Sequence, residues 1–178
     1  DVTICELLPH CLQLAFDIEF CTEAEKLLEQ RGVKFITDQK VTSIEGNSKV
    51  TGVKLANSTT LPADMVIVGI GTVANIDLAK KANLRLGPTG SIWVDRTMRT
   101  IDENIFSCGD CTEKFSFFGG IPSKLKLASI ACSEARIAGA NLFGTQRESV
   151  GTIGVFSSAI GDRSFAVAGL SENFAQQQ

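Results

Sequence analysis

The pattern of apolar and polar residues alternates between the periods of strands and helices and predicts a mixed α/β fold. A short apolar strand is predicted over residues 2–6. Apolar residues then recur at helical spacing over 20–28, with Asp17 or Thr22 as candidate caps and Gly32 as a helix stop. Residues 33–36 read as a second strand. The order strand, helix, strand is typical of a parallel sheet.

Three short β segments are predicted next, over 40–45, 49–55 and 59–62. Turn-forming residues at 46–47 and 57–58 separate them. Their short connections predict a small antiparallel meander.

The remainder of the chain mixes fully apolar strands with helices. The run 64–71 is apolar and ends in glycines, which is typical of a strand inside a parallel sheet. The other predicted elements are strands at 92–94, 105–110, 151–157 and 164–169, the last two joined by a Gly161-Asp162 turn, and helices at 76–82 and 127–143.

Composition narrows the class of protein. The chain has 178 residues and a net charge of −3. It has no basic stripe to release counterions from phosphates, so we expect no nucleic-acid partner. No apolar run reaches the length of a membrane span, so we expect no membrane association and a cytoplasmic location.

Six cysteines are scattered along the sequence, and Cys108 and Cys111 form a C-x-x-C pair. A redox pair usually opens a helix, where its thiol pKa is lowered, whereas Cys108 ends a predicted strand. A zinc site needs further ligands, and the sole histidine, His10, is distant in sequence. We therefore expect reduced thiols and no metal site, with a redox or zinc-binding cysteine pair as an alternative.

The predicted strand 105–110 ends in Gly109-Asp110. A carboxylate at the carboxyl end of a strand lies where open α/β sheets bind ligands, and it can accept hydrogen bonds from ligand hydroxyls. The alternative is a strand followed by a turn that begins at the aspartate. The helix that follows after about twenty residues favours the ligand site.

Together these elements resemble the pyridine nucleotide-disulfide oxidoreductases, flavoproteins with two dinucleotide-binding domains. The similarity is greatest to the branch of NADH oxidases, NADH peroxidases and coenzyme A-disulfide reductases. The resemblance implies part of a three-layer FAD/NAD(P)-binding fold with a β-meander, plus the start of an α+β dimerisation domain. Residues 1–75 would be the later part of the NAD(P)-binding domain, 76–149 the returning part of the FAD domain, and 150–178 the start of the dimerisation domain.

The resemblance also implies roles in binding FAD. Asp110, which follows Gly109, would bind the flavin ribitol. Backbone amides of Leu127 and Ala128, at the start of the helix, would face the pyrimidine edge of the flavin. The electrostatics agree, because a helix N-terminus stabilises negative charge on a reduced flavin. This chain has Glu134–Ala135–Arg136 where many relatives have Gln-Gly-Arg.

Roles in binding NADH follow in the same way. Gly69 and Gly71 would allow the nicotinamide dinucleotide to approach the backbone. Glu6, at the end of the first strand, would accept hydrogen bonds from ribose hydroxyls and disfavour a 2′-phosphate. No catalytic residue is assigned, because the redox cysteine of the family has no counterpart in this chain.

Both glycine-rich G-x-G-x-x-G phosphate loops of the family are absent from the sequence. We therefore expect a piece of a longer protein, with the loops in the part before Asp1. The parent would be an FAD-dependent oxidoreductase, a homodimer or larger assembly, that passes electrons from NADH to oxygen, peroxide or a disulfide. The alternative is a nucleotide-binding or assembly module without catalysis, and we expect the isolated chain to be inactive.

Overall fold

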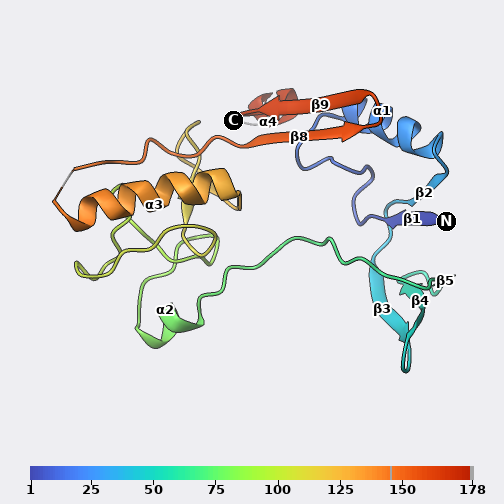
Figure 1. The fold of residues 1–178 in the computed structure, drawn as a ribbon, viewed down its shortest axis with the longest axis horizontal. Helices are drawn as coiled ribbons and strands as arrows, with labels where there is room; N and C mark the ends of the chain where they lie inside the picture. Colours follow the sequence, from blue (N-terminus) through green and yellow to red (C-terminus); the bar gives the residue numbers. More distant parts are fainter. Residues whose placement is uncertain (145, 177–178) are drawn as a thin grey trace. The chain divides into compact units, whose positions relative to one another are not determined.

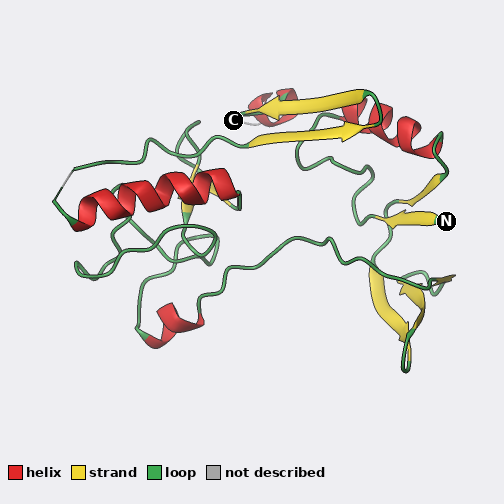
Figure 2. Cartoon of the chain, in the orientation of Figure 1, coloured by secondary structure: helices red, strands yellow, loops and turns green. Residues whose placement is uncertain are grey.

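The structure is a computed structural model that describes residues 1–144 and 146–176. The chain divides into two compact units (Figure 1). The first unit comprises Asp1–Ile70 with Val155–Gln178, and the second comprises Gly71–Gly154. The chain contains both helices and strands (Figure 2), which confirms the mixed α/β class. Assignment of 1–75, 76–149 and 150–178 to domains of the family stays a prediction.

The first unit begins with a strand-helix-strand motif. Strand β1 (Val2–Cys5) pairs in parallel with β2 (Val33–Ile36), and helix α1 (Ile18–Glu29) connects them. Asp17 occupies the N-cap position, and Gly32 has a φ of 83° just after the helix. Left-handed backbone of this kind favours glycine and ends a helix. The predicted order of strand, helix and strand is confirmed, and the structure adds the parallel pairing.

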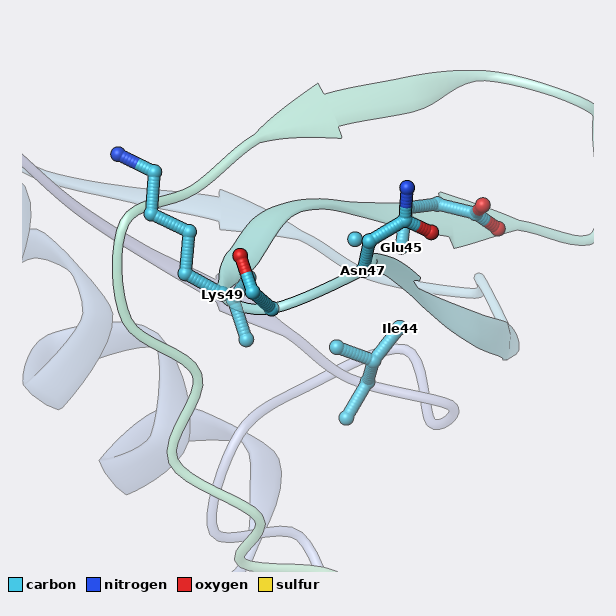
Figure 3. Close-up of a pocket in the computed structure, with 7 residues that line it drawn as sticks. Ile44, Glu45, Asn47 and Lys49 are labelled. Atoms are coloured by element: carbon cyan, nitrogen blue, oxygen red, sulfur yellow. The ribbon is translucent and has the colours of Figure 1, made fainter.

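The meander is also confirmed. Strands β3 (Val41–Gly46), β4 (Val50–Leu55) and β5 (Thr60–Pro62) form an antiparallel sheet in that order. A small hollow at the β3–β4 turn is lined by the consecutive residues 44–50 (Figure 3). Because all of its walls come from one hairpin turn, we regard it as a feature of that turn.

The end of the chain returns to the first unit. Strands β8 (Val155–Ile160) and β9 (Arg163–Ala168) form a hairpin across the predicted Gly161-Asp162 turn, and helix α4 (Glu172–Gln176) follows. The first strand of this hairpin begins four residues later than predicted. A shared apolar core joins the hairpin to α1, and its buried members are Phe16, Cys21, Ala24, Ile160 and Phe165.

The second unit has little regular sheet. It contains helix α2 (Asp77–Lys81), the short pair β6 (Lys114–Phe115) and β7 (Pro122–Ser123), and helix α3 (Ala128–Leu142). Helix α3 packs on a small core through Ala138, against Val94 and Met98. Both predicted helices of this unit are confirmed.

Three predicted strands are wrong. Residues 64–71 form no strand, 92–94 keep only isolated bridges at Ile92, and 105–110 keep one bridge at Phe106. The apolar run 64–71 is not buried either, since Ile67 and Ile70 are 86% and 91% exposed. A strand depends on hydrogen bonds to a neighbour that lies elsewhere in the sequence. In the described ranges, no neighbouring strand pairs with 64–71.

Among the helices of the described residues, none combines the length and the apolar character needed to span a membrane.

Substitution of Phe165 in the core of the first unit tests how β9 packs on α1. Phe165 is 8% exposed and its ring meets that of Phe16 edge to face, with ring centroids 6.4 Å apart. We expect Phe165→Ala to lower the free energy of unfolding by about 3–5 kcal/mol, because it removes buried apolar surface and leaves a cavity. Urea denaturation measures this change. As a control, Phe174→Ala, at a position 45% exposed, should have a much smaller effect. Equal losses for the two variants would contradict the packing described here.

Candidate functional site

The predicted flavin-binding turn lies against helix α3. Gly109 has a φ of 83°, a left-handed conformation that favours glycine. A Cβ added at this position would lie 3.6 Å from the Cβ of Ala131, in the first turns of α3. Asp110, the next residue, is exposed. The turn therefore holds a carboxylate at the surface beside the start of α3.

A buried ion pair holds this turn in place. The Lys114 ammonium lies 3.1 Å from Oε2 of Glu134, and their side chains are 1% and 6% exposed. Oε2 of Glu134 also accepts a hydrogen bond of 2.7 Å from the backbone N–H of Gly109. The ion pair thus contacts the backbone of the turn directly.

Lys114 uses its donors on the same turn. Besides Glu134, its ammonium donates to the carbonyl oxygens of Gly109 at 2.5 Å and of Thr112 at 3.3 Å. An ammonium has three protons, so all of its donors have partners. A buried cation with a full set of acceptors avoids the penalty of an unpaired charge.

The electrostatics of Glu134 reflect its burial. Removal from water raises the pKa of the Glu134 carboxyl, and the nearby charge of Asp110 adds to this. The Lys114 ammonium and the N–H of Gly109 act in the opposite direction and lower the pKa, without cancelling the effect of burial. Asp110 is thus close enough to affect Glu134 electrostatically.

The start of α3 carries backbone donors without helical acceptors. Leu127 is the N-cap residue, and within the described part of the chain no side chain caps this end. The amides of the first turn, including that of Ala128, have no intrahelical partner by the geometry of an α-helix. Ala128 is exposed. The turn of Gly109 and Asp110 is bonded to the same helix through Glu134, and the binding of FAD by these four residues stays a prediction.

The residues predicted to bind NADH are divided between the two units. Glu6 lies at the carboxyl end of β1, and its Oε1 accepts a hydrogen bond of 2.9 Å from the N–H of Leu8. Gly69 and Gly71 lie outside any helix or strand, with open space where a Cβ would be, and Gly71 has a φ of 86°. Gly69 belongs to the first unit with Glu6, whereas Gly71 begins the second. Hydrogen bonds among the described residues do not connect Glu6 with either glycine.

The C-x-x-C pair does not have the environment of activated thiols. Burial raises the pKa of Cys108, and the negative charge of Glu134 raises it further. The thiol of Cys111 donates to the carbonyl of Cys108 at 3.6 Å, and both cysteines are free. A reactive cysteine needs a lowered pKa, so these observations disfavour a redox role for the pair.

Lys114 and its contacts were not predicted from the sequence. A signal for Glu134 was present, because it lies on the apolar face of α3 at helical spacing with Ile130 and Ala138. An acid in that position indicates a buried partner. The identity of the partner, twenty residues earlier, has no local sequence signal.

Comparison with known proteins supports the resemblance seen in the sequence. Residues 1–135 match the family described as pyridine nucleotide-disulphide oxidoreductase. The chain belongs to this family. The pyridine nucleotide-disulphide oxidoreductases that it resembles include a protein named NADH oxidase from Methanocaldococcus jannaschii, 30% identical over 171 residues, which are 96% of this chain. The chain spans only 38% of that relative's length.

Solved structures of the family agree with the fold. An NAD-dependent persulfide reductase from A. fulgidus has a TM-score of 0.92 and 32% identity, over 99% of this chain and 32% of that one. An FAD-dependent pyridine nucleotide-disulphide oxidoreductase from Desulfovibrio vulgaris has a TM-score of 0.87 and 32% identity, over 99% of this chain and 45% of that one. The similarity therefore covers almost the whole chain and less than half of each solved protein.

The buried ion pair can be tested by a double-mutant cycle. We expect Lys114→Met and Glu134→Leu each to lower the free energy of unfolding by about 3–5 kcal/mol, because each leaves the opposite charge buried and unpaired. The double variant should lose less than the sum of the two, by about 1–3 kcal/mol. Urea denaturation of the four proteins measures the coupling. Losses that simply add would contradict the pairing.

The state of the cysteines can be tested by alkylation. Burial, with help from Glu25, raises the pKa of Cys11 to about 11, and burial likewise raises that of Cys108. Because the thiolate is the reactive form, alkylation of Cys11 at pH 8 should be slow and should increase up to about pH 11. Cys132 is exposed and should be labelled first. Mass spectrometry after iodoacetamide treatment locates the label.

Cys132→Ser is the control and should remove the fast phase of alkylation. A disulfide between Cys108 and Cys111, or labelling of Cys108 as fast as that of Cys132, would restore the redox alternative.

Proposed function

We propose that this chain is part of an FAD-dependent oxidoreductase that takes electrons from NADH and passes them through flavin to an acceptor. The observation that carries the proposal is the position of Asp110, an exposed carboxylate at the turn that packs against the start of α3. Membership of the family, and relatives named as an NADH oxidase and a persulfide reductase, support it.

The residues of the turn and of α3 fit a flavin. The Asp110 carboxylate would accept hydrogen bonds from ribitol hydroxyls. The amides of Leu127 and Ala128 would donate to the pyrimidine edge, and the positive end of the α3 dipole would favour negative charge there. When bound, FAD would supply the redox chemistry, accepting hydride and releasing electrons. The protein groups named here would bind the cofactor and adjust its electrostatics.

The nicotinamide side of the proposal rests on Glu6, Gly69 and Gly71. A carboxylate at the end of β1 would accept hydrogen bonds from both ribose hydroxyls and repel a 2′-phosphate, which favours NADH over NADPH. The open space around the two glycines would let a dinucleotide approach the backbone.

The acceptor, the assembly and the location belong to the same proposal. The acceptor would be a small molecule: oxygen, peroxide, or a sulfur compound such as coenzyme A-disulfide. The relatives named above support this range, since one is an NADH oxidase and another a persulfide reductase. The parent would act as a homodimer or larger assembly in the cytoplasm, where the six cysteines of this chain would stay reduced.

A nucleotide-binding or assembly module without catalysis is not favoured. Each of the named relatives and solved structures is an oxidase, a reductase or an oxidoreductase. The C-x-x-C alternative is disfavoured by the raised pKa of Cys108.

Substitution of Asp110 tests the flavin site. The complete parent protein should purify yellow and oxidise NADH. We expect Asp110→Asn to raise the dissociation constant for FAD by about 10- to 100-fold, because hydrogen bonds to a charged acceptor are worth about 1.5–3 kcal/mol. Quenching of flavin fluorescence on titration of the apoprotein measures the constant.

Asp102→Asn is the matched control, since Asp102 is an exposed turn aspartate of the same unit, and among the described residues its carboxylate accepts a hydrogen bond only from the N–H of Asn104. It should leave the affinity for FAD unchanged. A colourless parent that cannot be reconstituted with FAD would refute the proposal.

A further inference from the structure

We propose that Glu134 and Lys114 are positioning residues that align Asp110 with the N-terminus of α3, so that both can bind one flavin. Neither side chain is expected to touch the flavin, because both are buried beneath the turn. This inference rests on the proposed function and adds a role that the family resemblance did not assign.

Both backbone polar groups of Gly109 are bonded to the ion pair. Its N–H donates to Glu134 at 2.7 Å, and its carbonyl oxygen accepts from Lys114 at 2.5 Å. The carbonyl also accepts the N–H of Thr112 at 3.0 Å, which closes the turn itself. The ion pair therefore bonds both the N–H and the carbonyl of Gly109. Within the turn, the N–H of Thr112 adds one further hydrogen bond to that carbonyl.

The direction of Asp110 follows from these contacts. The carbonyl of Gly109 and the N–H of Asp110 share one planar peptide unit. The hydrogen bonds to that carbonyl fix the orientation of this peptide plane. The orientation of the plane in turn limits where the Asp110 side chain can point. The carboxylate is exposed, so packing of its own side chain cannot set its direction. Its orientation depends instead on the backbone held beneath it.

Helix α3 supplies the other half of the alignment. Glu134 lies two turns into α3, whose first-turn amides are the predicted donors to the flavin. The bond from Gly109 to Glu134 therefore joins the two flavin-binding elements directly. Glutamine at this position, as in many relatives, could accept the same N–H but could not form an ion pair with Lys114.

The experiment uses the complete parent protein as apoprotein, with FAD as the probe. It compares Glu134→Leu, Glu134→Gln and the charge exchange K114E/E134K. The exchange restores an ion pair, but a lysine at 134 cannot accept the N–H of Gly109 and a glutamate at 114 cannot donate to its carbonyl. Lys34→Met is the control, since it removes a lysine that is 70% exposed. Fluorescence titration gives the dissociation constant, and urea denaturation gives the midpoint of unfolding.

We expect Glu134→Leu to weaken FAD binding by about tenfold or more, as expected for a lost bond to a charged acceptor, and Glu134→Gln to weaken it much less. The exchange should bind FAD as weakly as Glu134→Leu, because its ion pair can bond neither backbone polar group of Gly109. Its urea midpoint should also stay below wild type, because a carboxylate at 114 would face the carbonyl oxygens of Gly109 and Thr112. Lys34→Met should change neither.

Wild-type affinity in Glu134→Leu would overturn the inference, as would equal losses in the leucine and glutamine variants. Recovery of FAD binding in the exchange would overturn it too, because binding would then not depend on the hydrogen bonds to Gly109. If the exchange variant does not fold, the comparison of FAD binding by Glu134→Leu and Glu134→Gln still tests the inference. A wild-type parent that fails to bind FAD would instead refute the proposed function.

Discussion

The candidate site depends on one buried ion pair. Lys114 and Glu134 come from segments twenty residues apart, and both contact the backbone of Gly109. Among the described residues, the hydrogen bonds that join this turn to α3 all involve this pair. The position of Asp110 relative to the N-terminus of α3 therefore depends on buried charges. Those charges are stable only because the three donors of Lys114 and the carboxylate of Glu134 have partners.

The parts of the fold that were predictable are those that local sequence determines. Helix α1 has helical spacing between a cap at Asp17 and a glycine stop at Gly32, and its signal is complete within one segment. The meander and the Gly161-Asp162 hairpin were predictable for the same reason, since neighbours in the sheet are neighbours in sequence. In each case the residues that decide the structure lie within a few positions of one another.

The predictions that failed concern strands whose partners lie elsewhere. The run 64–71 has the composition of a buried parallel strand, but in the described part of the chain it has no hydrogen-bonded neighbour and its side chains are exposed. The composition of a segment indicates which secondary structure it favours, whereas strand pairing also depends on a second segment. The same limit hid Lys114. Glu134 interrupts the apolar face of α3, which indicates a buried, positively charged partner. No residue near Glu134 in the sequence identifies that partner as Lys114.

A buried ion pair is weak evidence of stability, because apolar residues of similar volume often serve as well or better. The pair in this protein does something that apolar residues could not. Leucine or methionine at these positions could fill the space beneath the turn but could neither accept the N–H of Gly109 nor donate to its carbonyl. The ion pair is therefore better explained by orientation than by stability. It bonds both polar groups of Gly109, the residue before the carboxylate that we propose binds the ribitol.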